Sequence, residues 1–353
     1  MHFTFTDEQS ILVDTAKAFF AEHATSKRTR AAMSARGIDG ELWRSFTQEL
    51  GFGGITVPED LGGAGLGMVE LAIVSEAAGA NVAALPMLGS IAMTAQAIVA
   101  GGTLAQKSTW LPKLIAGEKI GACAGSDDLM SIENELTGTA SFLPHGDSAN
   151  VFVLGRNGEA WIVDQSAVGL TVSALTTMDQ TRPYARLTLA SVRGESLADG
   201  AAGLMAARHA GWICVAAEAL GGAQACLDKT VSYSLDRVQF GRQIGSFQAY
   251  KHRLADMMIE IEQARSAVYW AACAVDEGAE DAHIALHSAK AFAADTYMMC
   301  AGNMIQLHGG IGFTWEHDAH LYFKRARAIS SILGSSDWHR ENIARLIGLG
   351  DAA

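Results

Sequence analysis

The sequence predicts a mainly α-helical protein in which an N-terminal helical domain, a small antiparallel β-domain and a C-terminal antiparallel four-helix bundle follow one another. Residues 1–115 have helical periodicity, residues 116–202 contain short stretches typical of strands, and residues 203–353 are helical again. Only 5 prolines occur among the 353 residues, which favours long helices. A chain of this length is sufficient for two or three packed domains.

The N-terminal domain is expected to start with a helix that Thr6 caps. Asp7 and Glu8 follow in its first turn, where carboxylates suit the positive end of the helix dipole. Residues 49–67 contain seven glycines and one proline, so they are predicted to form a loop with tight turns. Helical patterns resume at the segments MVELAIVSEAAGANVAALP and STWLPKLIAGEKI.

The β-domain is predicted from four short segments that alternate in polarity or are rich in β-branched residues. Turn residues separate them, which favours antiparallel pairing. The segments are SANVFVLG, EAWIVD, LTVSAL and YARLTLASV.

The C-terminal bundle is predicted from helical patterns that end near residue 236 and then cover residues 247–277, 281–307 and 336–347. In the second pattern, apolar residues recur at spacings of three, four or seven, so one face is expected to be buried. These residues are Leu254, Met258, Ile261, Val268 and Val275.

Composition excludes several classes of function. The formal net charge of −12 argues against nucleic-acid binding, because phosphate contacts require a basic face. The 5 cysteines form no CxxC pair and no metal-ligand spacing, so they indicate reduced thiols and no metal site. No signal peptide and no membrane span are expected. The prediction is a cytoplasmic protein.

One segment between two bundle helices has a regular spacing of aromatic, amide and basic residues. It reads DRVQFGRQIGSFQAYKHRLADMM at residues 236–258. Two interpretations are open from the residues alone. Phe240 and Phe247 could pack two helices together, with Gly241 as a helix terminator. Alternatively, Arg237 could bind a ligand, since its guanidinium is a planar fork of donors that suits a pyrophosphate.

The order of the domains together with this segment resembles the acyl-CoA dehydrogenase family over nearly the whole chain. RVQFGRQIGSFQ resembles the family's Arg-x-x-Phe-Gly-x-x-Ile-x-x-Phe-Gln segment. QLHGGIGFTWEHDAHLYFKRARA resembles its Gln-x-x-Gly-Gly segment and the Arg-rich helix after it, and LGFGGITVPEDLGGAGLGMVELAIVSEAAG resembles its N-terminal loop and helix. The first two together are highly specific.

The resemblance implies an oxidoreductase that uses FAD to dehydrogenate an acyl-CoA thioester between its α- and β-carbons. It also implies an electron-transfer acceptor and a role in fatty acid or steroid side-chain β-oxidation. His308 either contacts the nucleotide or caps a helix end. The residues implied to bind FAD are Arg237, Phe240, Gln248, Gln306, His308, Gly309 and Gly310.

The sequence departs from the family at the catalytic base. The reaction needs a carboxylate to remove the α-proton. One family position for this glutamate is occupied here by Leu333, and the other by Gly211, with Trp212 in place of the family's arginine beside it. We therefore assign no catalytic residue. Glu218 or Asp337 could replace the missing base, although each is more typical of a paired or solvated helix carboxylate.

A second departure lies in the β-domain, where the family covers the flavin ring with two segments. Gly125, Ser126 and Asp127 are retained, but the family's preceding Thr-Glu-Pro is missing. The family's Trp-Ile-Thr-Asn strand corresponds to SFLPHGDSAN, in which Pro144 has no backbone N–H.

The retained and lost motifs predict a helper subunit in a mixed oligomer. In family dimers, the retained motifs grip the distal half of a neighbour's FAD, whereas the lost motifs serve the chain's own flavin ring and base. The expected partner is a longer acyl-CoA dehydrogenase-like chain, as in actinobacterial enzymes that shorten steroid side chains. The alternative is a non-catalytic binding or scaffold protein without flavin.

Two groups of side chains are expected to have only structural roles. Three histidines are predicted to lie on helix surfaces, and four methionines to fill the core. They are His209, His283 and His287, and Met257, Met258, Met298 and Met299.

Overall fold

The computed structural model describes residues 4–349 and divides into two compact units. The helical unit comprises residues 4–26, 72–83 and 212–349, and the mixed unit comprises residues 27–71 and 84–211. Each unit therefore combines segments that lie far apart in the sequence. The mainly helical fold with a central β-region confirms the predicted fold class.

The strands of the mixed unit form two four-stranded sheets, ordered β1-β4-β5-β8 and β2-β3-β7-β6. Every pairing in them is antiparallel except that of β1 with β4, which is parallel. Buried side chains from both sheets, including Ala122, Phe152 and Leu187, form one apolar core. The strands are β1 (Gly121–Gly125), β2 (Met130–Ile132), β3 (Glu135–Pro144), β4 (Val151–Arg156), β5 (Glu159–Asp164), β6 (Leu170–Leu175), β7 (Tyr184–Arg193) and β8 (Glu195–Ser196).

Short helices accompany these sheets in the mixed unit. The predicted glycine-rich loop contains two 3₁₀ turns, η2 and η3, and the helix predicted after it ends at Ala80. A second helical segment follows, and its Ser90 hydroxyl accepts a hydrogen bond from the Gly121 amide of β1 at 3.0 Å. The elements are α2 (Ser26–Met33), α3 (Gly40–Arg44), η1 (Ser45–Glu49), η2 (Phe52–Gly54), η3 (Glu59–Leu61), η4 (Leu88–Ala95), α5 (Gln96–Gly101) and α6 (Leu104–Ile115).

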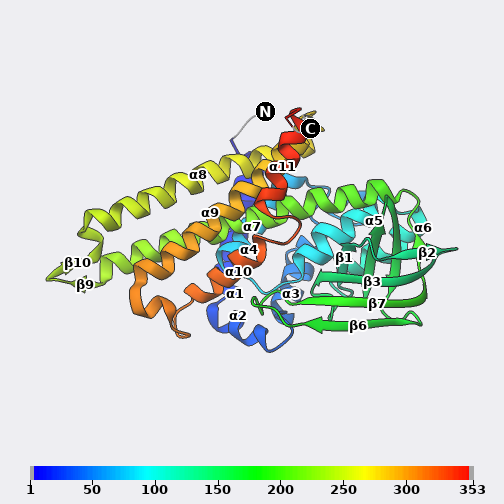
Figure 1. Ribbon diagram of the computed structural model, residues 1–353, viewed down its shortest axis with the longest axis horizontal. Coiled ribbons are helices and arrows are strands. Elements are labelled where there is room, and N and C mark those ends of the chain that lie inside the picture. Colours follow the sequence, from blue (N-terminus) through cyan, green and yellow to red (C-terminus); the bar gives the residue numbers. More distant parts are fainter. Residues whose placement is uncertain (1–3, 350–353) are drawn as a thin grey trace. The chain divides into compact units, whose positions relative to one another are not determined.

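The helical unit contains the predicted bundle (Figure 1). In it, α8 and α9 pack side by side, and α10 and α11 both pack against α9. A two-stranded hairpin of β9 and β10 joins α7 to α8. The elements are α1 (Asp7–His23), α4 (Met68–Ala80), α7 (Gly200–Asp236), β9 (Val238–Gln239), β10 (Arg242–Gln243), η5 (Ile244–Ser246), α8 (Gln248–Asp276), α9 (Ala282–His308), η6 (Gly309–Phe313), α10 (Ala319–Ile329) and α11 (Ser336–Leu346).

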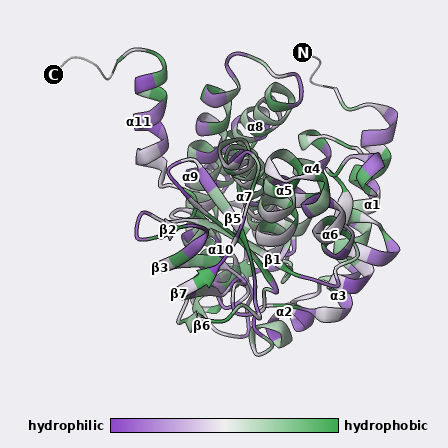
Figure 2. Ribbon diagram, turned by 90° about the vertical axis from the view of Figure 1, so that its right-hand side faces the viewer, coloured by the Kyte–Doolittle hydropathy of each residue, from purple (hydrophilic) through white to green (hydrophobic). Residues whose placement is uncertain are grey.

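Local signals predicted several helix details correctly. Thr6 caps α1 and forms a reciprocal capping box with Gln9. Ile261 and Val268 are buried on α8 as expected. Met258, however, is 54% exposed, and its neighbour Met257 is fully buried, so the predicted face was wrong at this position. Figure 2 shows polar and apolar turns alternating along α11, as expected for a surface helix.

Among residues 4–349, one helix is long and apolar enough to cross a membrane. This helix is α7, and 94% of its most apolar window is buried inside the protein. Because this window is almost entirely buried, α7 is a core helix of the protein.

Candidate functional site

The β9–β10 hairpin presents Phe240 at its tip. Phe240 and Gly241 form a two-residue turn in which φ is +54° and +78° respectively. Positive φ at both positions is the geometry of a type I′ turn, which favours Asn-Gly and strains an aromatic residue. Phe240 is 91% exposed, and its ring meets only the edge of Phe247, with centroids 6.2 Å apart. So small a contact does not account for a strained, exposed aromatic side chain, which leaves the predicted cofactor contact of Phe240 as a hypothesis.

The end of α9 presents the Gln-x-x-Gly-Gly segment. Gly309 has φ of +66°, which favours glycine. Gly310 has no such requirement, and a Cβ added to either glycine would meet no atom of the described residues, its chain neighbours aside, within 4 Å. The open space above both backbones is suited to close approach by a nucleotide.

Direct contacts join these two segments within the helical unit. The Tyr250 hydroxyl near the start of α8 donates to the Leu307 carbonyl at 3.2 Å. Burial raises the pKa of Tyr250 to about 12, so this donor keeps its proton. Tyr233 on α7 stacks on His308 with ring centroids 4.4 Å apart. The ends of α7, α8 and α9 are thereby held together.

Six of the seven predicted FAD residues are exposed on this part of the helical unit. We call Arg237, Phe240, Gln248, Gln306, Gly309 and Gly310 the candidate cofactor surface. The Arg237 guanidinium forms no ion pair or hydrogen bond within residues 4–349. An unpaired cation and two uncovered glycine backbones on helix ends that are held together fit the pyrophosphate and nucleotide of FAD.

His308 differs from the other six residues because it is buried, with 4% exposure. Its Nδ1 lies 2.7 Å from the Met304 carbonyl oxygen, to which it donates. Burial lowers the pKa of the imidazole, so the neutral ring is favoured. This geometry fits the helix-capping alternative for His308 better than direct contact with a nucleotide.

Replacing Phe240 by asparagine is expected to stabilise the chain while weakening FAD binding. Asparagine suits the first position of a type I′ turn, so the free energy of unfolding should rise by about 1 kcal/mol. The aromatic contact would be lost. Thermal unfolding of the chain and flavin titration of the assembled complex measure the two effects. A loss of stability would contradict the strain at Phe240, and unchanged flavin affinity would contradict its contact.

The turn that contains Leu333, which occupies one of the two family base positions, is fixed by hydrogen bonds from neighbouring side chains. Leu333 lies in the turn between α10 and α11 with φ of +56°. Its carbonyl oxygen accepts from the Trp212 indole at 2.8 Å and lies 3.1 Å from His339 Nε2. Trp212 replaces the arginine beside the second family base position. The hydrogen bond between Trp212 and Leu333 therefore connects the two places at which the sequence departs from the family's base motifs.

A buried pair of histidines supports this turn. His287 and His339 face each other with their Nδ1 atoms 2.7 Å apart. Because His339 donates from Nε2 to Leu333, its Nδ1 must accept the proton of His287. Burial and the nearby Lys290 lower the pKa of His339 to about 3, which keeps this ring neutral. His287 is only 5% exposed, so its predicted surface position was wrong, whereas His283 is exposed.

Lys290 is also fully buried beside this turn. Its Nζ donates to the carbonyl oxygens of Ile329 and Gly334, the first of them at 3.0 Å. Burial lowers the pKa of Lys290 to about 8. This lysine caps the end of α10 and fixes the backbone next to Leu333.

Neither alternative carboxylate is placed as a general base. Glu218 is 3% exposed and forms a buried ion pair with Arg325 on α10. Asp337 is 97% exposed at its side chain and pairs with Arg340, three residues later on α11. Glu218 is therefore engaged by Arg325 inside the protein, and Asp337 is solvated.

In the mixed unit, the retained Gly-Ser-Asp segment is used for internal contacts. The Ser126 hydroxyl donates to the Thr139 carbonyl, and its backbone amide donates to the Gly155 carbonyl at 2.9 Å. After Pro144, the amide of His145 donates to the Pro183 carbonyl at 2.8 Å. The Ser126 hydroxyl and the amides of Ser126 and His145 thus already have hydrogen-bond partners within the mixed unit.

The fold and the candidate cofactor surface define the chain as a flavoprotein dehydrogenase by class. Residues 6–118 match the acyl-CoA dehydrogenase N-terminal domain, and residues 198–348 match the acyl-CoA dehydrogenase C-terminal domain. The chain belongs to the acyl-CoA dehydrogenase family, which comprises FAD-dependent oxidoreductases.

Curated relatives and solved structures match over nearly the whole chain. Acyl-CoA dehydrogenase IpdE2 of Mycolicibacterium smegmatis is 35% identical, covering 97% of this chain and 98% of the relative. The ChsE4–ChsE5 complex of Mycobacterium tuberculosis contains a chain that is 26% identical with a TM-score of 0.90, covering 100% of both chains. A Tcur3481–Tcur3483 steroid ACAD variant is 32% identical with a TM-score of 0.87, covering 98% of this chain and 99% of that chain.

Proposed function

We propose that this chain is a subunit of a mixed acyl-CoA dehydrogenase in which a longer partner chain supplies the catalytic base. The observation that carries the proposal is the contrast between two regions. The candidate cofactor surface is exposed and its Arg237 is unpaired, whereas Leu333 is fixed by Trp212 and His339 where the family has a base. Two of the solved relatives have names that describe two-component assemblies, ChsE4–ChsE5 and Tcur3481–Tcur3483.

The proposed role of the chain is to hold the distal half of FAD for its partner. FAD, when bound, would supply the acceptor for the hydride that leaves the β-carbon of the acyl-CoA thioester. Arg237 would pair with the pyrophosphate, and Gln306 with the amides near Gly309 and Gly310 would line the nucleotide pocket. Phe240 would cover the same ligand from the hairpin tip. The partner's carboxylate removes the α-proton, because Leu333 has no group that can accept one.

The proposal also includes the localisation of the complex, its electron acceptor and its substrate. We infer a cytoplasmic complex that passes electrons to an electron-transfer acceptor. Its substrate is an acyl-CoA of the fatty acid or steroid side-chain type. The name of one similar structure describes a steroid enzyme. The alternative is a scaffold without flavin, and flavin absorbance of the co-purified complex distinguishes the two.

Arg237→Ala tests the proposal. This change removes a charge-assisted contact worth about 1.5–3 kcal/mol, so flavin affinity should fall about 10- to 150-fold. The two chains should stay associated, because Arg237 lies on the exposed cofactor surface and not in the packed bundle. The measurement is flavin per complex after co-purification with a longer acyl-CoA dehydrogenase-like chain. Arg345→Ala, an exposed position on α11, is the matched control. Full flavin occupancy of the Arg237 variant would refute the helper role.

A further inference from the structure

The candidate cofactor surface is divided among three helix ends of the helical unit. Arg237 directly follows α7, Gln248 begins α8, and Gln306, Gly309 and Gly310 lie at the end of α9 or just after it. One ligand can engage all of these groups at once only when the three ends keep fixed positions relative to one another. The contacts that join the ends are therefore relevant to flavin binding.

The end of α7 is held against the end of α9 by a stacked pair of rings. Tyr233 lies one turn before Arg237, and its carbonyl accepts the Arg237 amide at 2.9 Å. The Tyr233 ring stacks on His308, with centroids 4.4 Å apart and an angle of 21° between the ring planes. His308 directly precedes Gly309 and is itself fixed, because its Nδ1 donates to the Met304 carbonyl. The stack thus connects the backbone that carries Arg237 with the backbone that carries Gly309.

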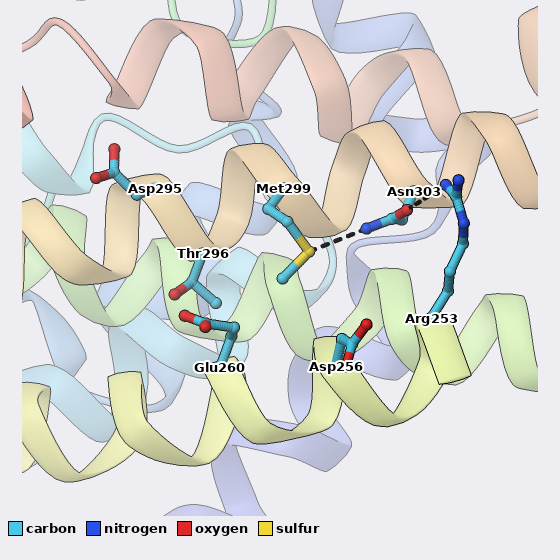
Figure 3. A pocket seen from close by; sticks show the side chains of 7 residues that line it. All are labelled: Arg253, Asp256, Glu260, Asp295, Thr296, Met299 and Asn303. Carbon is cyan, nitrogen blue, oxygen red and sulfur yellow. Dashed lines mark hydrogen bonds between the residues drawn. The ribbon is translucent and has the colours of Figure 1, made fainter. Parts of the chain in front are cut away.

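The start of α8 is held against the same end of α9 by a hydrogen bond. Tyr250, two residues after Gln248, donates from its hydroxyl to the Leu307 carbonyl at 3.2 Å. Leu307 is in the last turn of α9, whose carbonyl groups lack the usual partners four residues later. One turn further along the two helices, Arg253 of α8 donates to Asn303 of α9 at 3.1 Å (Figure 3). Arg253 is exposed, so water competes for that contact, and we expect the half-buried Tyr250 to be the stronger link.

The turn that follows α9 is packed closely onto the same helix end. Gly312 is buried, and a Cβ added to it would lie 2.7 Å from the Ile305 carbonyl oxygen and 3.0 Å from the Cβ of His308. So close an approach requires glycine at this position. Gly309 and Gly310 thus lie between a fixed helix end and a fixed turn, although their own backbones are uncovered.

We propose that Tyr233, Tyr250 and His308 form a clasp that positions the three parts of the candidate cofactor surface, so that flavin affinity depends on these residues without their touching the flavin. The inference rests on the proposed function, because it concerns the same surface. The clasp acts by pre-organisation: it fixes the binding groups before the ligand arrives, so less conformational freedom is lost on binding.

Tyr250→Phe tests the hydrogen bond of the clasp in the complex with a longer acyl-CoA dehydrogenase-like chain. This change removes the hydroxyl and keeps the ring. Flavin affinity should fall about fivefold, the typical effect of one hydrogen bond on an equilibrium constant.

Tyr322→Phe is the matched control for the Tyr250 variant. The Tyr322 hydroxyl donates to the Ala80 carbonyl at 2.8 Å within the helical unit, and neither residue belongs to the candidate cofactor surface. The control removes the same kind of bond, so it should lower the melting temperature at least as much as Tyr250→Phe does. It should leave flavin affinity unchanged.

Two substitutions at Tyr233 test the stack. Tyr233→Phe keeps a ring against His308, so it should bind flavin like the unaltered complex. Tyr233→Leu removes the stack and should weaken flavin binding about fivefold. Recovery of affinity by the aromatic replacement is the readout that a role in folding alone does not predict.

Flavin titration of each complex, with thermal unfolding beside it, gives distinguishable outcomes. Unchanged affinity in Tyr250→Phe or in Tyr233→Leu would overturn the clasp and leave the proposed function standing. Equal losses in the two Tyr233 variants would overturn it as well, and so would an equal loss in Tyr322→Phe, because affinity would then follow overall stability. An unaltered complex that binds no flavin would overturn the proposed function and the clasp together.

Discussion

The isolated chain is expected to dehydrogenate acyl-CoA thioesters at least about 100-fold more slowly than the complex with its partner. General-base assistance is typically worth about 100- to 10,000-fold, and Leu333 and Gly211 occupy both family base positions. Glu218 is committed to Arg325 inside the bundle, and Asp337 is solvated on α11. Leu333 and Gly211 have no carboxylate, and neither Glu218 nor Asp337 is placed to take the α-proton.

The measurement is reduction of an artificial electron acceptor by the isolated chain, by the partner alone and by the complex, each loaded with FAD. Leu333→Glu in the isolated chain is the informative variant. It should remain inactive, because the chain also lacks the Thr-Glu-Pro segment that precedes Gly-Ser-Asp and covers the flavin ring in the family. Robust turnover by the unaltered isolated chain would show that the chain has a catalytic base of its own. Loss of that turnover in Glu218→Gln would then identify Glu218 as this base.

Arg325→Met is expected to lower the free energy of unfolding by about 3–5 kcal/mol. Arg325 is 1% exposed and its partner Glu218 is 3% exposed, so removing the cation takes this ion pair away from a buried carboxylate. Glu218→Met combined with Arg325→Met should recover most of the loss, since apolar side chains can replace a buried ion pair at little cost. Chemical denaturation of the unaltered chain and the two variants measures these differences.

The matched control is Arg345→Met, which removes one member of a largely exposed pair with Glu341. It should change the free energy of unfolding by no more than about 1 kcal/mol. Equal effects of the Arg325 and Arg345 variants would show that burial does not determine the strength of the Glu218 pair.

The sequence was sufficient to predict the order of helical and β-regions, because periodicity and capping are local properties. Thr6 and the four β-domain segments illustrate this. Local spacing failed at Met258, since the helix buries the adjacent Met257 and the three-, four- and seven-residue pattern fits several faces almost equally. His287 was misplaced for a similar reason: its burial depends on Trp212 and His339, which lie far away in the sequence.

For the candidate site, the motif predicted which residues carry the chemistry but gave no backbone angles. The positive φ of Phe240 became apparent only in the hairpin, although the Phe-Gly pair was a signal for a tight turn. The helix-capping bond of His308 depends on its own α9 backbone, so both of its roles stayed open from the sequence. The FAD contacts themselves remain predictions.

The hydrogen bonds to the Leu333 carbonyl have an evolutionary consequence. Loss of the glutamate alone would be reversible by a single substitution at that position. Here Trp212, His287 and His339 form a network with the same turn, so a glutamate at position 333 would meet surroundings that differ from those of the family at more than one residue. Under the proposed mixed assembly, a return to a self-sufficient chain would therefore need several substitutions.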